Sequence, residues 1–241
     1  MKIQITNRFS REIILSGEAD TLRAFLRTIK TAGTNLSGVD LAGANLAGMN
    51  FAKADFSGAN LSGANLTRAD LTEADLAGCN LTRAILAGAK LTRADLTEAN
   101  LTGADLSLAD LEKAALVNAD MYWSSLTGAR LVGADLSQTN LARSNLTAAN
   151  LTGADLFWAD LGGANLTMAI LVSAVLTVAN LTRANLTSAD LSAATLSGAE
   201  LVSADLSDAN LTGADVTDAN LIGAILDGAN LTDVDTSKAR R

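Results

Sequence analysis

Between Leu36 and Leu231 an apolar residue recurs at every fifth position. Leucine takes this central position in all but four of the 40 units, and Ala stands two residues earlier in nearly every unit. On an α-helix, successive central residues would step by about 140° and share no face. On a straight strand, an odd period would send them to opposite faces in turn. All of them can point inward only if the chain turns a corner once per unit, so the sequence predicts a solenoid whose sides are one pentad long.

Each unit also carries turn residues. Asp or Asn usually precedes the central residue, Thr, Ser or Ala follows it, and Gly often comes next, which suits a turn. The residues before the centre are sorted at intervals of 20: Asp is concentrated in the series that contains Asp55, and Asn in the series that contains Asn60. Residues 20 apart stack if each coil has four sides, so this sorting favours a four-sided solenoid.

The repeating Ala-Asp/Asn-Leu-x-x unit over residues 36–231 resembles the pentapeptide-repeat family. The resemblance implies a right-handed quadrilateral β-helix with four pentads per coil. It also implies that the central residue and the residue two before it point inward. We therefore expect an all-β solenoid of about ten coils with a small N-terminal hairpin-plus-helix cap. At ~4.8 Å between hydrogen-bonded strands, the shaft would be about 48 Å long.

Residues 1–33 depart from the repeat and predict a β-hairpin followed by a helix. The hairpin is indicated by alternating Ile3 and Ile5, a turn at Asn7-Arg8 and a second strand at 12–15. The helix is indicated by Asp20 as N-cap, Gly33 as stop, and apolar spacing at Leu22, Phe25, Leu26 and Ile29. Because the open end of a solenoid needs a cap, we interpret this segment as one. A partner-binding module is the alternative.

We divide the chain into an N-terminal cap (1–33), a β-helix (34–235) and a polar C-terminal tail (236–241). The resemblance implies that gyrase-targeting relatives dimerise through a C-terminal helical segment, and this tail has no apolar helix of that kind. Two alternatives stay open: the tail covers the last coil weakly, or two shafts meet end to end.

The composition excludes several classes of site. The chain has no His and one cysteine, Cys79, so neither a His-based active site nor an intramolecular disulfide nor a multi-cysteine metal site can be assembled. Cys79 stands in for an inward Ala, so we interpret it as a small core residue. The net charge of −8 argues against direct nucleic-acid binding. Without a signal peptide or an 18-residue apolar stretch, we expect a soluble, cytoplasmic protein without a membrane contact. Because the chain has no His and a tube filled with leucines has no distinct pocket, we also expect no enzymatic activity, no cofactor and no metal.

Two sets of outward positions are candidates for a binding surface. The first is an apolar patch: Tyr122, Trp123, Phe157, Trp158, Val175 and Val178. Aromatic residues exposed together are enriched at protein interfaces, although drift at free surface positions would also produce them. The second is an acidic stripe: Asp55, Asp75, Asp95, Asp135 and Asp155. Its simpler interpretation is duplication of units in which Asp and Asn are both acceptable, and its functional interpretation is mimicry of the phosphates of DNA.

The first functional hypothesis is a non-enzymatic structural or protein-interaction module whose protein partner the sequence does not name. A homodimer through end-to-end or aromatic-patch contact is one form of it. The alternative is a DNA-mimicking modulator of a type II topoisomerase (gyrase), as in the pentapeptide-repeat proteins of quinolone resistance.

Overall fold

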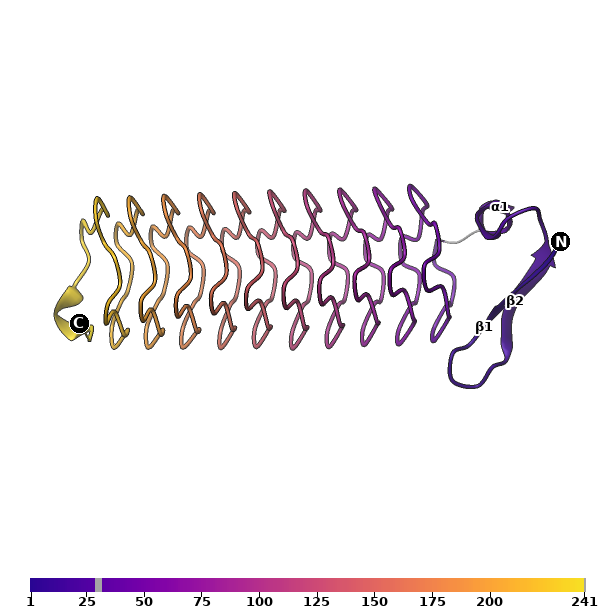
Figure 1. The fold of residues 1–241 in the computed structure, drawn as a ribbon, viewed down its shortest axis with the longest axis horizontal. Helices are drawn as coiled ribbons and strands as arrows, with labels where there is room; N and C mark the ends of the chain where they lie inside the picture. Colours follow the sequence, from indigo (N-terminus) through magenta and orange to yellow (C-terminus); the bar gives the residue numbers. More distant parts are fainter. Residues whose placement is uncertain (29–31, 241) are drawn as a thin grey trace.

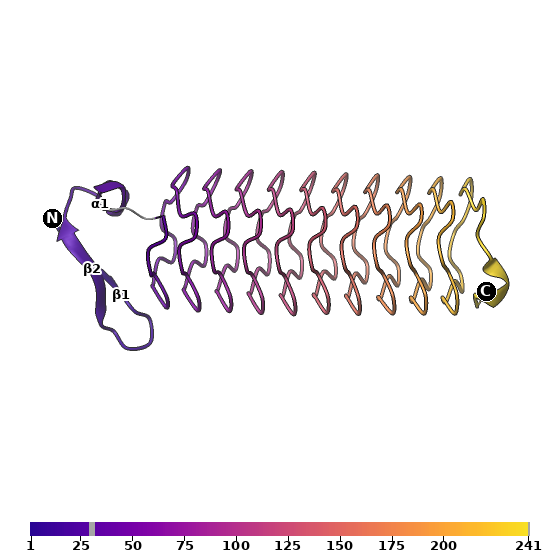
Figure 2. The ribbon, with the colours of Figure 1, turned by 180° about the vertical axis from the view of Figure 1, so that it is seen from behind.

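The computed structural model describes residues 1–28 and 32–240 of the chain. It is a long shaft of stacked coils, with a hairpin and a short helix at its N-terminal end (Figures 1 and 2). Isolated parallel β-bridges join residues 20 positions apart, from Asn35–Asp55 to Asn220–Arg240. Because every pentad forms one side, a 20-residue coil has four sides, as the sorting of Asp and Asn predicts.

The backbone hydrogen bonds explain why the corner recurs every five residues. The N–H of the central residue of each unit bonds to the next coil, as Leu76 does to the carbonyl of Asp95 at 2.7 Å. Another N–H closes a four-residue turn, as Cys79 does onto the carbonyl of Leu76 at 3.1 Å. The third residue of that turn has a positive φ throughout the shaft, for example +61° at Gly78, which is the conformation of a type II turn.

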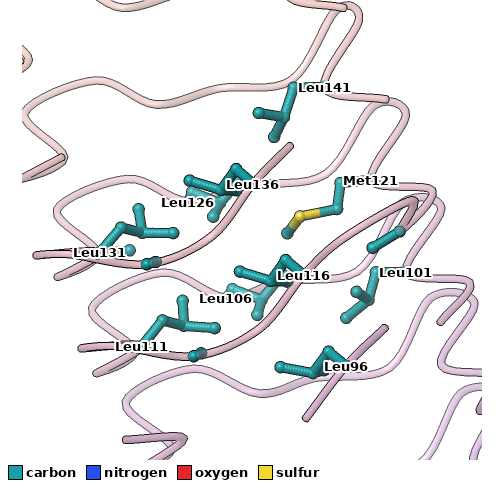
Figure 3. Packing of buried hydrophobic residues seen from close by; sticks show 14 of the residues in the cluster. Leu96, Leu101, Leu106, Leu111, Leu116, Met121, Leu126, Leu131, Leu136 and Leu141 are labelled. Carbon is teal, nitrogen blue, oxygen red and sulfur yellow. The ribbon is translucent and has the colours of Figure 1, made fainter. Parts of the chain in front are cut away.

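The core consists of the two inward positions of every unit. The central Leu residues from Leu36 to Leu221 and the small residues two positions before them are buried almost throughout. Figure 3 shows these leucines stacked coil upon coil, with Met121 taking one leucine position. Each buried leucine contributes on the order of 1.5–3 kcal/mol, so the stack is the main source of stability of the shaft.

Polar or larger residues at inward positions are mostly satisfied locally; among the described residues the exception is the buried Ser124 hydroxyl, which has no hydrogen-bond partner. Phe51 and Phe56 are fully buried and meet edge to face, with ring centroids 5.1 Å apart. Thr139 Oγ1 donates to the carbonyl of Leu116 at 2.8 Å. Cys79 is buried and donates its thiol to the carbonyl of Phe56 at 2.8 Å, as expected for a core residue in place of Ala.

The N-terminal segment forms the expected hairpin and helix. Strand β1 (Lys2–Thr6) pairs antiparallel with β2 (Ile13–Glu18), so the second strand begins one residue later and runs three residues further than 12–15. Helix α1 (Leu22–Thr28) follows. The prediction of Asp20 as its N-cap is wrong: Thr21 occupies the cap, because its Oγ1 accepts the N–H of Ala24 at 3.1 Å. Ile29 lies outside the described residues.

This segment covers the first coil. The Arg8 N–H donates to the Gly38 carbonyl at 2.7 Å, and the Asp40 N–H donates to the Thr6 carbonyl at 3.1 Å. Arg23 of α1 reaches the carbonyl of Ala47 at 2.5 Å. Backbone groups that an open end would leave unpaired are therefore bonded at this corner.

The C-terminal end is covered less. A 3-10 helix, η1 (Thr236–Lys238), is capped by Asp235, and the chain then returns to the shaft, where the Leu221 N–H donates to the Arg240 carbonyl at 2.7 Å. Leu226 and Leu231 in the last coil are only partly buried. No helix in the described part of the chain is long and apolar enough to cross a membrane.

Candidate functional site

Because bridges connect residues 20 apart, the shaft has four continuous faces. We define face 1 as residues 34–38 and every segment 20 residues further on, through 214–218, and faces 2, 3 and 4 as the sets that begin at 39, 44 and 49. In each segment the second residue forms the inter-coil bridge, and the fourth and fifth form the corner. All outward side chains of one face are therefore brought into columns.

An apolar patch lies on face 1. Phe157 and Trp158 stack with their ring centroids 6.2 Å apart and their planes at 8°. The bridge from Asp155 to Val175 places Val175 and Val178 on the following coil. The exposed fractions are 41% for Phe157, 61% for Trp158, 36% for Val175 and 44% for Val178, so the four side chains form an exposed patch.

The six residues of the sequence-based patch do not form one site. Tyr122 and Trp123 follow Asp120, which bridges to Asn100 and Asn140 on face 2. They are exposed, Trp123 to 69%, but they lie round a corner from face 1. We therefore define the face 1 patch as Phe157, Trp158, Val175 and Val178.

Two residues of the face 1 patch have a backbone conformation that their side chains disfavour. Trp158 has a φ of +58° and Val178 a φ of +56°, in the left-handed region that favours glycine. Val178 is the one β-branched side chain with a positive φ among residues 1–28 and 32–240. At the same position of the next face 1 segment the chain has Gly198, which meets this requirement without strain. The fold therefore gives no reason for Trp or Val at these two corners.

The acidic stripe also lies on face 1, and the structure gives each Asp a local role. Each Oδ1 accepts a hydrogen bond from the N–H of the residue two positions further on. This bond closes a small ring and gives that N–H an acceptor. The distances are between 2.9 and 3.0 Å for Asp55, Asp75, Asp95, Asp135 and Asp155. Asn accepts the same bond on another face: the Thr102 N–H donates to Asn100 Oδ1 at 2.9 Å. An uncharged oxygen acceptor therefore serves this turn as well as a carboxylate does, and Ala115 and Val175 hold the same bridging position of face 1 with no acceptor at all.

On face 2 the same column combines donors with acceptors. Asn60 donates its amide to Asp40 at 2.9 Å, and Asn180 donates to Asp160 at 2.8 Å. Such ladders link successive coils through side chains. Asp cannot donate when ionised, so the stacked carboxylates of face 1 repel one another where Asn would form a ladder.

The charges of the shaft are segregated by face. Face 1 carries eight acidic side chains and no Lys or Arg, whereas each of the other faces carries at least one Arg. The eight are Asp55, Asp75, Asp95, Glu98, Asp135, Asp155, Asp215 and Asp218. None of them is buried. Face 4, by contrast, pairs its charges: Arg130 bonds both Glu112 and, at 3.2 Å, Asp110, and these two hydrogen bonds raise the pKa of the Arg130 guanidinium.

Sequence reasoning missed one part of this surface. The hairpin loop reaches the start of face 1: the Asn7 amide donates to the Ser37 carbonyl at 3.3 Å, and Phe9 Cε2 lies 3.8 Å from where a Cβ on Gly58 would stand. Phe9 is 70% exposed, and the Arg8 guanidinium stands 4.5 Å from the centre of its ring. The signal in the sequence was an aromatic residue between two arginines at a turn.

The reactive side chains offer little chemistry. Burial raises the pKa of the Cys79 thiol to about 12, so the thiol stays protonated at neutral pH and is a poor nucleophile. Among the described residues, no three acidic or cysteine side chains gather in a way that could hold a metal ion.

Comparison with known protein families agrees with the geometry. The family model described as pentapeptide repeats matches the chain in eight copies, which run without a gap from residue 34 to residue 235. The chain belongs to the pentapeptide-repeat family. The family fold is the right-handed quadrilateral β-helix, and the resemblance stated from the repeat units is therefore confirmed.

Several solved pentapeptide-repeat structures are similar to this chain. HetL, a protein involved in heterocyst differentiation regulation from the cyanobacterium Nostoc sp. strain PCC 7120, is 36% identical over 88% of this chain and 94% of its own, with a TM-score of 0.66. Rfr23 from the cyanobacterium Cyanothece 51142 is 38% identical over 40% of this chain and 63% of its own, with a TM-score of 0.36. QnrB1, a plasmid-mediated fluoroquinolone resistance protein, is 21% identical over 85% of this chain and 88% of its own, with a TM-score of 0.38. No curated protein sequence matches the chain.

Proposed function

We propose that this pentapeptide-repeat protein is a non-catalytic protein-interaction module whose contact surface is face 1. The observation that carries the proposal is the face 1 patch: two stacked aromatic rings and two valines are exposed together. Exposed aromatic residues are enriched at protein interfaces.

The acidic stripe supports the same face. Asn would make the turn bond of each stripe Asp and would add a ladder to the next coil, so the fold is served at least as well without the charges. A feature that the fold does not need and that costs electrostatic energy is most simply retained for an interaction outside the chain. The likeness to HetL, which is involved in heterocyst differentiation regulation, supports a regulatory role that acts through binding.

The side chains of this protein also favour binding over catalysis. The chain contains no His, and its Cys79 thiol is buried and protonated at neutral pH. The acidic groups of face 1 are solvated on the outside of a tube filled with leucine and alanine. Binding is therefore the activity that these surfaces support.

The test uses two variants of the full chain and capture of binding proteins from the host. Phe157→Ser with Trp158→Ala removes the aromatic part of the face 1 patch. Tyr122→Ser with Trp123→Ala is the matched control, because these residues hold the same corner positions on face 2. We expect the first variant to lose specific capture while the control retains it, with both variants folded by circular dichroism. Capture that survives the first variant, or that depends on the control pair, would contradict the choice of face 1.

One observation favours a second candidate function, the modulation of a type II topoisomerase by DNA mimicry. Face 1 is acidic along the shaft and has no basic side chain, as a surface that imitates a phosphate backbone requires. The test is a supercoiling assay with purified gyrase, with and without a quinolone. Absence of both inhibition and protection would exclude this candidate.

A further inference from the structure

The face 1 patch lies between two groups of negative charge. Asp155 belongs to the same segment as Phe157 and Trp158, and Asp135 stands one coil earlier. In the opposite direction Asp215 stands two coils beyond Val175, in the same column. With coils ~4.8 Å apart, all three carboxylates lie within about 10 Å of the patch along the shaft. An occupant of the patch therefore meets negative charge on both sides and no Lys or Arg within the face 1 segments; Lys238, which helps to lower the pKa of Asp215, lies one coil beyond their C-terminal end.

A second copy of the chain does not suit this surface. If two copies met through face 1, eight acidic side chains would oppose eight others, without a Lys or Arg on either face to pair them. Like charges placed opposite one another destabilise an interface and suppress that partner. The homodimer through the aromatic patch is thus the less favourable occupant, although the apolar residues alone would allow it.

The chain itself shows what chemistry can lie on face 1. The loop that follows β1 extends over the first two face 1 segments, with its backbone bonded to Gly38 and its Phe9 ring over Gly58. Arg8 and Arg11 flank this exposed aromatic side chain. An aromatic side chain of a short loop is therefore already seated at the N-terminal end of the same face, while the Arg8 guanidinium stands against the Phe9 ring and neither Arg8 nor Arg11 forms an ion pair with a described face 1 carboxylate.

We propose that the face 1 patch binds an extended basic segment of a partner protein. In this segment an aromatic or branched aliphatic side chain covers Trp158 and Val178, and Lys or Arg residues on either side approach Asp135 and Asp155 or Asp215. The inference rests on the proposed function and adds the chemistry of the partner. The apolar contact supplies most of the affinity, and the charges supply selectivity and a faster association.

The test measures binding of fluorescent peptides to the full chain by anisotropy. The probe is a ten-residue peptide that alternates Lys with Phe or Ser, and its controls are the same peptide with Glu for Lys and with Ala for Phe. We expect the Lys/Phe peptide to bind, the Glu/Phe peptide not to bind, and the affinity of the first to fall as NaCl is raised. Equal binding of the Lys and Glu peptides, or no binding of the Lys/Phe peptide, would overturn the proposal.

Variants locate the binding site. Phe157→Ser with Trp158→Ala should weaken the Lys/Phe peptide by roughly 10-fold or more, and Asp135→Asn with Asp155→Asn by about 3-fold at low salt. Asp105→Asn with Asp205→Asn is the matched control, because these face 3 residues make the same turn bond, and it should leave the affinity unchanged. An equal effect of the face 3 pair would show nonspecific attraction to net charge and overturn the proposal.

Two further outcomes separate this inference from the proposed function. If the peptide does not bind but capture of a host protein still depends on Phe157 and Trp158, the proposed function stands and the basic partner is wrong. If sedimentation shows a dimer that Trp158→Ala abolishes, the occupant is a second copy, and the basic partner is again wrong. If neither capture nor peptide binding depends on the patch, both proposals fail.

Discussion

The acidic stripe permits a quantitative test of why face 1 is charged. Replacement of all five stripe residues by Asn should keep the fold, because the amide oxygen accepts the same turn N–H that the carboxylate accepts. The substitutions are Asp55→Asn, Asp75→Asn, Asp95→Asn, Asp135→Asn and Asp155→Asn. They remove the like-charge repulsion and introduce amide donors of the kind that link the coils on face 2. The variant should therefore be more stable than the natural sequence.

The size of the gain follows from the stacking. The β-bridges make three adjacent carboxylate pairs, Asp55–Asp75, Asp75–Asp95 and Asp135–Asp155, whereas Ala115 separates the other two neighbours. At ~4.8 Å and a dielectric constant near that of water, each pair costs about 0.9 kcal/mol, so three cost about 2–3 kcal/mol. A Debye length of roughly 8 Å at physiological ionic strength lowers this cost by about half.

The measurement is urea-induced unfolding, followed by circular dichroism in 10 mM and 150 mM NaCl. We expect a higher free energy of unfolding for the Asn variant, with the larger difference at low salt. The control, Asp105→Asn with Asp205→Asn, should change little with salt, because neither residue has a carboxylate in the bridging position above or below it. A variant that is less stable than the natural chain, or a gain that does not respond to salt, would refute the reasoning.

Three further predictions concern the corners, the core and a carboxyl group. Val178→Gly should be more stable than Val178→Ala by about 0.5–1 kcal/mol, because only glycine tolerates a φ of +56° freely, and the opposite order in urea unfolding would contradict the assigned corner. Ala154→Leu should destabilise the shaft by about 1–3 kcal/mol through overpacking, and an unchanged melting temperature would remove Ala154 from the core. The hydrogen bond from the Ser207 hydroxyl lowers the pKa of the Asp205 carboxyl below 3.8. The contribution of ionised Asp205 to the stability of the fold is therefore complete above pH 3.8 and is lost as the pH falls through the lowered pKa. Ser207→Ala should return this pKa toward 3.8 in an NMR titration, and an unmoved pKa would assign the shift to another cause.

Much of the fold could be predicted because every unit has the same pattern of inward and turn residues. The period of five predicts the corner, and the 20-residue sorting of Asp and Asn predicts four sides, which the bridges from Asn35 to Arg240 confirm. The exact residue at which an element begins was less predictable, because neighbouring residues can be equally suitable. The N-cap is one example: Asp20 and Thr21 are both suitable residues, and the actual start of α1 at Leu22 selects Thr21.

The candidate site was predicted in part. Once four sides were assumed, the face shared by Phe157, Trp158, Val175 and Val178 could be derived from their numbers alone. The same arithmetic separates Tyr122 from this group, and the structure shows that the two sets lie on different faces. The turn bond made by each stripe Asp could not be derived, because it depends on the path of the backbone between the bridge and the corner.

The sequence by itself predicted the architecture of this protein, since a five-residue period with Leu and Ala inward requires a corner per unit and the 20-residue sorting of Asp and Asn favours four sides. It also determined which side chains share a face, because a regular coil converts numbering into position. Only the tertiary structure decided what those side chains do. Backbone geometry makes the stripe Asp residues turn acceptors that Asn could replace, and it places Trp158 and Val178 at corners suited to glycine. The contact of the hairpin loop with Gly58 likewise joins segments about 50 residues apart, and no local pattern encodes it.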